Sequence, residues 1–142
     1  MPNTPSRFND FVAAQDDVYA AVLEELRAGK KETHWMWFIF PQLKGLGRSP
    51  VAQRFALADE TEARAYFAHE VRGPRLLACT QLVLNAPSDR AREIFGDIDC
   101  LKFRSCMTLF AQISEPGSVF HETLAKFFDG LPDQATLNLL HR

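Results

Sequence analysis

The stretch HWMWFIFPQLKGLGRS, residues 34–49, places six large apolar side chains in a row ahead of a loop with two glycines and two cations. If the apolar run is helical, Trp35, Phe38 and Ile39 share one face and the other aromatic rings point elsewhere. The run is then apolar nearly all round, as expected of a helix buried on most sides. A short apolar run cannot be told from a buried strand by its period alone, but no other segment shows the alternation of a strand that could pair with it. We predict a buried helix.

The residues on both sides of this run are also typical of helices. Upstream, apolar residues from Phe11 to Leu26 recur at spacings of three and four; Asn9 or Asp10 can cap this helix, and Gly29, followed by Lys30 and Lys31, ends it. Downstream helices are expected at Ser49-Pro50, from Asp59 through Val71, from Gly73-Pro74 to Asn85, from Ser88 or Asp89 to Gly96, from Asp97 or Asp99 to about Gln112, at Ser118, and after Pro132 to near His141. We predict an all-α, compact multihelical single domain over residues 1–142, with about residues 1–8 as a flexible N-terminus.

The composition is that of a soluble globular protein, with 46% hydrophobic and 24% charged residues. The formal net charge of -2 gives no bulk attraction to nucleic acid or to anionic lipid. The N-terminus has no secretory apolar segment, and the longest apolar run is far shorter than the ~20 residues of a membrane span. The three cysteines form no C-x-x-C pair. We expect a reduced, cytoplasmic protein that does not enter membranes and is a monomer or a weak homodimer.

The loop that follows the apolar run has the features of a phosphate site. Gly45 and Gly47 let a ligand approach the backbone closely, and Lys44 and Arg48 supply positive charge. Ser49 precedes a proline suited to the first position of a helix, where unpaired N–H groups favour an anion. The segment matches neither G-x-G-x-x-G nor G-x-x-x-x-G-K-[ST], so an ordinary connecting loop is the alternative.

Two features of the apolar run go beyond core packing, which is the alternative explanation for most of its side chains. Trp35 and Trp37 each carry an N–H that needs a partner when it is buried, and His34 beside them can exchange protons near neutral pH. Both the indole N–H groups and the histidine would be explained if these rings turned an edge toward a cleft. In this stretch the candidate ligand-binding residues are Trp35, Trp37, Gln42, Lys44, Gly45, Gly47, Arg48 and Ser49.

A second unusual stretch is IFGDIDCLKFRSCMTLF, residues 94–110. If a helix begins near Asp99, this carboxylate lies one turn from Lys102, and Lys102 lies on one side of the helix with Ser105 and Cys106. A buried lysine three residues from a serine can activate a nucleophile, although a solvated lysine beside a helical serine is the simpler explanation. Cys106 is expected to be a small core residue. Asp99 and Lys102 are candidates for proton transfer, and Ser105 is a candidate ligand-binding residue.

The remaining histidines, His69, His121 and His141, show neither H-x-x-x-H nor H-E-x-x-H spacing. No cluster of carboxylates completes a site with them, which argues against a catalytic zinc. The chain also lacks the G-x-S-x-G elbow of many serine hydrolases. We expect neither a metal nor a cofactor.

The segment FVAAQDDVYAAVLEELRAGKKETHWMWFIFPQLKGLGRSPVAQRFAL and the segment EIFGDIDCLKFRSCMTLFA carry a family resemblance. They closely resemble a family of small bacterial all-α proteins known as domain of unknown function (DUF) eighteen-ten, and the likeness runs from about Phe11 to the last helix. The resemblance implies a compact multihelical fold and no established activity. Family members usually carry serine at the position of Cys106, which argues against a shared nucleophilic role. Some members are called calpastatin, a label that suits a disordered, repetitive inhibitor rather than this aromatic-rich chain.

The helical layout and the basic and aromatic motifs also resemble, more distantly, helical proteins proposed to act as N-glycosidases on NAD- and ADP-ribose-type metabolites. We therefore expect a phosphorylated or nucleotide-like small molecule to bind between the aromatic helix and the helix that begins near Asp99. His34, Asp99 and Lys102 would then transfer protons, and whether hydrolysis follows binding stays open.

The alternative is a non-catalytic protein-interaction module. It predicts a contiguous exposed apolar patch larger than ~400 Å², with Lys44 and Arg48 pointing away from any cavity. A nucleic-acid binder is disfavoured by the net charge.

Overall fold

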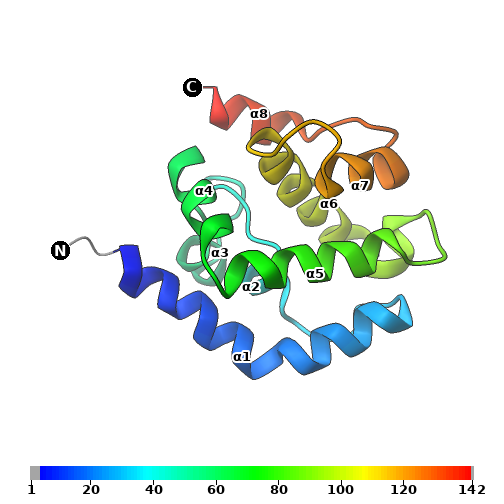
Figure 1. Cartoon of the computed structure of the whole chain (residues 1–142), viewed down its shortest axis with the longest axis horizontal. Coiled ribbons are helices and arrows are strands. Elements are labelled where there is room, and N and C mark those ends of the chain that lie inside the picture. Colours follow the sequence, from blue (N-terminus) through cyan, green and yellow to red (C-terminus); the bar gives the residue numbers. More distant parts are fainter. Residues whose placement is uncertain (1–3, 142) are drawn as a thin grey trace.

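A computed structural model describes residues 4–141 of the chain, and the side chains from Asp10 onward. Within these residues the chain forms helices and no strand, so the predicted all-α fold is confirmed. The helices are α1 (Thr4–Ala28), α2 (Met36–Ile39), α3 (Pro50–Arg54), α4 (Glu60–Ala68), α5 (Arg72–Leu84), α6 (Ala91–Gln112), α7 (Val119–Phe128) and α8 (Gln134–Leu140). Figure 1 shows α1 packed along α5 on one side of the molecule, with α6, α7 and α8 gathered on the other.

Side-chain caps start three helices at the positions that the sequence predicts. Ser49 before α3, Asp59 before α4 and Ser118 before α7 each have extended backbone and accept a hydrogen bond from the backbone N–H three residues later. Such a cap satisfies one of the N–H groups that a helix start leaves without an intrahelical acceptor. These helix starts depend only on residues that are close together in the sequence, so they can be predicted from it.

The first helix begins earlier than the sequence predicts. α1 starts at Thr4 rather than after Asn9 or Asp10, so residues 4–8 have helical backbone although we predict them to be flexible. The remainder of that predicted segment, residues 1–3, lies outside the described residues.

The junction between α4 and α5 also differs from the prediction. α4 ends at Ala68, before the predicted end at Val71, because His69 is extended and closes the helix. The His69 Nδ1 atom then accepts hydrogen bonds from the backbone N–H groups of Val71 (3.1 Å) and Arg72 (3.3 Å), at the start of α5. Capping by a histidine through an unprotonated ring nitrogen is not among the helix starts that the sequence predicts.

A break at Gly96 divides α6 into two helical halves, at the residue where we predict one helix to end and the next to begin. Gly96 has φ 85° and ψ 174°, a conformation that is essentially restricted to glycine. The second half carries Asp99 and Lys102 toward α2 and places Phe103 in the core, where it is fully buried.

The apolar run lies in the core, as predicted, but only α2 within it is helical. Trp35 is 1% exposed and Phe40 is fully buried. The Phe40 ring meets those of Phe95 and Phe103 edge to face, with centroids 5.9 and 5.0 Å apart, a geometry that stabilises aromatic pairs beyond simple burial. Trp37 is half-buried and reaches the surface.

After α2 the chain turns toward α4. Leu43 and Leu57 form an isolated parallel bridge. The Lys44 N–H donates to the Leu57 carbonyl, and the Leu57 N–H donates to the Gln42 carbonyl, both at 2.8 Å. These bonds fix the beginning of the glycine-containing loop beside the start of α4.

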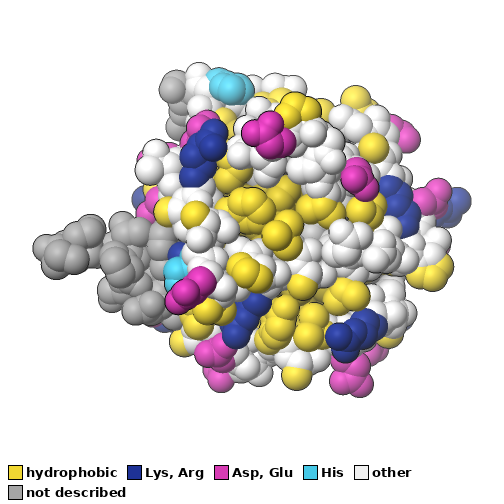
Figure 2. Space-filling model, viewed as in Figure 1, with side chains coloured by type: hydrophobic (Ala, Val, Ile, Leu, Met, Phe, Trp, Pro, Cys, Tyr) yellow, Lys and Arg dark blue, Asp and Glu magenta, His cyan; other side chains and the backbone are white. Residues whose placement is uncertain are grey.

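Part of the hydrophobic side-chain surface remains accessible. Figure 2 shows hydrophobic side chains at the surface between α1 and α5, with charged side chains around them. None of the helices in residues 4–141 combines the length and the apolar character that crossing a bilayer requires.

Candidate functional site

A pocket of about 310 Å³ opens between the start of α2 and the second half of α6. We call it the tryptophan pocket; its walls include Lys31, His34, Trp35, Trp37, Asp99 and Lys102, together with apolar side chains of α2 and α3. The structure thus brings together both tryptophans and all three residues predicted to transfer protons. Two other recesses are larger, at about 460 and 470 Å³, but neither is lined by a tryptophan or a histidine.

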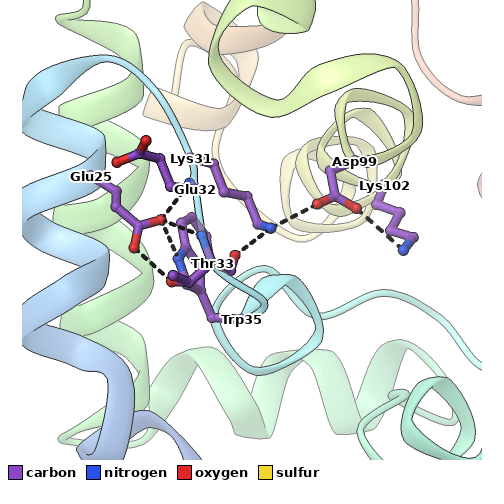
Figure 3. A network of polar contacts seen from close by, with 7 residues as sticks. All are labelled: Glu25, Lys31, Glu32, Thr33, Trp35, Asp99 and Lys102. Atoms are coloured by element: carbon purple, nitrogen blue, oxygen red, sulfur yellow. Dashed lines mark hydrogen bonds and ion pairs between the residues drawn. The ribbon is translucent and has the colours of Figure 1, made fainter.

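The segment before α2 is held in place by the carboxylate of Glu25, which projects from α1 (Figure 3). This carboxylate accepts hydrogen bonds from the Glu32 N–H (2.7 Å), the Thr33 N–H (3.0 Å), the Thr33 hydroxyl (2.6 Å) and Trp35 Nε1 (2.9 Å). Burial opposes ionisation of Glu25, but these bonds outweigh it and lower its pKa to about 2. The Trp35 indole N–H therefore has its partner inside the protein and does not face a ligand.

Lys31 connects this segment to α6. Its Nζ atom donates to the Thr33 carbonyl (2.6 Å) and lies 2.9 Å from Asp99 Oδ2, above the Trp35 ring. The Lys31 side chain is only 7% exposed. Figure 3 shows Lys31 and Lys102 reaching the Asp99 carboxylate from opposite sides.

Asp99 is the shared partner of two ammonium groups. Its Oδ1 atom lies 3.3 Å from Lys102 Nζ. Burial works against ionisation of Asp99, but the hydrogen bonds and charges of Lys31 and Lys102 prevail, so the pKa of Asp99 lies below its ordinary value. Asp99 is therefore ionised at neutral pH and cannot act as a proton donor there.

Lys102 and Trp37 form the more open part of the pocket. The Lys102 ammonium stands 4.9 Å from the centre of the Trp37 ring, a cation–π distance, and the Lys102 side chain is 28% exposed. Trp37 is fixed from another direction by Gly47, where an added Cβ would lie 2.6 Å from the indole Cη2 atom and from Ala52 Cβ. Gly47 is therefore required for close packing against Trp37.

His34 lines the same pocket and is exposed. Its side chain therefore borders both the pocket and the solvent. It is the histidine among the described residues that line this pocket.

The predicted phosphate loop is not part of this pocket. Lys44 and Gly45 line the separate recess of about 460 Å³ beside the start of α4 and the end of α8. Arg48 is exposed, and its carbonyl accepts a hydrogen bond from the Gln53 side chain. The Ser49 hydroxyl caps α3, a helix of five residues. The loop cations follow the tryptophans closely in sequence, but the pairing of Leu43 with Leu57 directs the loop toward α4.

The two other predicted ligand-binding residues lie inside the fold. Gln42 is 2% exposed, and its side-chain nitrogen is buried without a hydrogen-bond partner among the described residues. Ser105 is 7% exposed, and its hydroxyl donates to the Leu101 carbonyl one turn back along α6. Neither lines the tryptophan pocket. Cys106 is fully buried, as predicted, and burial raises the pKa of its thiol, so this thiol is not an activated nucleophile.

The sequence prediction missed Glu25 and Lys31. Lys31 enters the prediction only as a charge at the end of the first helix, and Glu25 is not among the predicted site residues. The signal that could have found them is the need of a buried tryptophan N–H for an acceptor, which points to a carboxylate on a neighbouring element. Within the described residues, no group of three or more histidines, cysteines and carboxylates is arranged to hold a metal ion.

Comparisons with known proteins agree with this architecture. Among solved structures, the chain is similar to the conserved hypothetical protein Rv1873 from Mycobacterium tuberculosis, whose crystal structure was determined at 1.38 Å. The two share 48% sequence identity, the similarity covers 97% of this chain and 99% of that chain, and the TM-score is 0.94. No curated protein matches the chain. Residues 5–140 match the family described as Protein of unknown function (DUF1810), and the chain belongs to that family.

Proposed function

We propose that the tryptophan pocket binds a small anionic molecule that carries a planar ring, of the phosphorylated or nucleotide-like class. The observation that supports this proposal is the position of Lys102, whose ammonium lies over the Trp37 ring while 28% of its side chain remains exposed. An aromatic surface and an accessible cation therefore meet at one place. Ligand pockets commonly combine apolar walls with a few convergent polar groups in this way.

The charges in the pocket favour an anion. Lys31 is enclosed, and Asp99 compensates its charge, since Lys31 Nζ and Asp99 Oδ2 lie 2.9 Å apart. Lys102 shares the same carboxylate at the longer distance of 3.3 Å. The two lysines and the one carboxylate together carry one net positive charge. Lys102 is the accessible cation, so it is the group that would pair with a phosphate or carboxylate.

The size of the pocket favours a compact ligand. Its volume of about 310 Å³ is at the lower end of the range of roughly 300–1,000 Å³ that is usual for small-molecule sites. Trp37 is half-buried, so part of its indole is available to a planar ring. Stacking of a ring on Trp37 and pairing of an anion with Lys102 would together select a nucleotide or an aryl phosphate over a simple sugar.

The same residues suggest which reaction could follow binding. Hydrolysis of an N-glycosidic bond passes through a transition state with positive charge on the sugar ring, and a carboxylate held in the ionised form can stabilise that charge. Asp99 fits that role. His34 is the exposed titratable group that could take a proton from the attacking water. The reaction class proposed is therefore glycosidic hydrolysis, with binding as its first requirement.

Binding can be tested with nucleotides, sugar phosphates and NAD fragments, by thermal shift and by tryptophan fluorescence. A ligand present at 100 times its Kd should add about 2.7 kcal/mol to the unfolding free energy. Lys102→Met removes the charge and keeps most of the side chain, and we expect it to weaken binding about tenfold or more. Lys44→Met makes the same change in another recess and should leave binding unaltered. The proposal fails if no compound shifts the melting temperature, or if both variants bind as the wild type does.

Hydrolysis has a separate test. Release of nicotinamide or of a free base from a compound that binds can be followed by chromatography, and Asp99→Asn should abolish it while binding persists. If wild-type protein binds but releases no product over hours, the pocket serves binding alone.

One observation supports the alternative function of a protein-interaction module. Ile98 and Leu101 lie one turn apart on α6 and are 72% and 60% exposed. A partner that covers this pair would be lost in an Ile98→Asp variant. Sedimentation of the wild type and of this variant, alone and with candidate partners, tests the alternative without involving the pocket.

A further inference from the structure

A second recess adjoins the tryptophan pocket. It has a volume of about 470 Å³ and lies between α1 and α3, with Phe38 and Val51 in its wall. The same two side chains also line the tryptophan pocket. The two recesses therefore meet at Phe38 and Val51, and Val51 is 44% exposed between them. A ligand longer than a nucleotide can extend from one recess into the other across this pair.

The second recess differs in charge from the tryptophan pocket. Its charged side chains are Asp10, Asp17 and Arg54. Arg54 lies 3.5 Å from Asp10, so these two charges offset each other. Asp17 is exposed, and no described residue forms an ion pair with it. The second recess therefore presents one negative charge, whereas the tryptophan pocket presents the ammonium of Lys102.

Two of the side chains that line the second recess are aromatic. The Phe38 and Phe55 rings meet edge to face with centroids 4.7 Å apart. The Arg54 guanidinium already lies 5.2 Å from the centre of the Phe55 ring, so a cation is accommodated here against an aromatic face. An alkyl chain that ends in an ammonium group has the matching chemistry, since its methylenes can cover the rings and its charge can pair with a carboxylate.

From these features we infer that the ligand has two parts, an anionic planar part in the tryptophan pocket and an arm with a cationic amine that crosses Phe38 and Val51 to reach Asp17. This inference rests on the proposed function, because it assigns the planar part to the same pocket. It adds that the rest of the ligand is an arm with a cationic amine, and that Asp17 is the residue that selects for this amine.

The test uses adenosine monophosphate (AMP) and derivatives that carry an aminohexyl arm on N6 or on C8 of the purine. Hexyl derivatives of the same two positions, without the amine, are the neutral counterparts. With wild-type protein we expect at least one aminohexyl compound to bind about two- to five-fold more tightly than its hexyl counterpart, the range usual for an exposed ion pair. Asp17→Asn should remove this advantage. Glu24→Gln, a change of another exposed carboxylate of α1 that lines neither recess, should retain it.

The outcomes separate this inference from the proposed function. If AMP binds but the amine gives no advantage at either position, or if the advantage survives in Asp17→Asn, the inference is overturned and the proposed function stands. If neither AMP nor any derivative binds, the inference is overturned, while the proposed function is decided separately by the wider panel of nucleotides, sugar phosphates and NAD fragments. Circular dichroism of each variant shows that the fold is retained, and since Asp17 is exposed we expect no change.

Discussion

Replacing Glu25 with glutamine tests the network that holds the segment before α2. The ionised carboxylate accepts four hydrogen bonds, from Glu32, Thr33 and Trp35, and its pKa falls from an ordinary 4.5 to about 2. Each pKa unit corresponds to about 1.4 kcal/mol, so the folded state favours the ionised form by about 3 kcal/mol. Glutamine keeps one acceptor oxygen but directs an NH₂ group at donors, so most of this stabilisation should be lost.

The sign of the pH dependence follows from the two pKa values. In the unfolded chain Glu25 titrates near 4.5 and in the folded protein near 2, so between these values the unfolded state binds more protons. The contribution of Glu25 is therefore complete above about pH 4.5 and disappears as the pH falls through about 2. Urea unfolding at pH 7 should show Glu25→Gln to be less stable than the wild type by about 3 kcal/mol, and the difference should shrink steadily below pH 4.5.

The control is Glu24→Gln, which changes an exposed carboxylate next to Glu25 and should alter stability by less than about 0.5 kcal/mol. In a thermal scan, a loss of about 3 kcal/mol corresponds to a decrease in Tm of about 10 °C for a chain of this size. Wild-type stability of Glu25→Gln at pH 7 would refute the role assigned to the network. A deficit that is as large at pH 3 as at pH 7 would show that the loss does not come from the charge.

Three further predictions concern single positions. Gly47→Ala should cost about 1–3 kcal/mol in urea unfolding and should change tryptophan fluorescence, because the added Cβ would lie 2.6 Å from the Trp37 ring; unchanged emission would contradict this packing. Gly96→Ala should also cost about 1–3 kcal/mol, here from backbone strain alone, since φ is 85° and nothing lies within 4 Å of the added Cβ. Burial, followed by a nearby guanidinium charge, lowers the pKa of His69 below its ordinary 6.5. Stability should therefore fall as the pH decreases through 6.5, and His69→Asn should lose part of this dependence; an NMR titration midpoint above 6.5 for the imidazole would disprove the assignment.

The sequence predicts those features of the fold that depend on neighbouring residues. A serine or aspartate cap, such as Ser49, Asp59 or Ser118, acts on an N–H group three residues away, so its effect is contained in a short window. The break at Gly96 is predictable for the same reason. The start of α1 at Thr4 cannot be predicted in this way, because helix propensity alone does not determine how far a helix extends upstream of a favourable capping residue.

The sequence predicts the candidate site only in part. The prediction groups the tryptophans with Asp99 and Lys102, and these residues line one pocket. Helical spacing accounts only for the closeness of Asp99 to Lys102, since Trp35 precedes α2 and the two stretches lie far apart in sequence. The prediction adds Arg48 to this group because it is close in sequence, but the chain direction after Pro41 separates Arg48 from the tryptophans. The pairing of Lys31 with Asp99 joins two distant segments, and sequence spacing carries no information on such a contact.

The interruption of α6 at Gly96 also has an electrostatic consequence for Asp99. Because the peptide dipoles of a helix add only along a continuous hydrogen-bonded segment, each half of α6 has its own positive end. The positive end of the second half lies at residues 97–99. Asp99 therefore occupies the first turn of that half, where a carboxylate is favoured. A helix that continued through residue 96 would move this end back to Ala91 and leave Asp99 at mid-helix, where the peptide dipoles would no longer stabilise its charge.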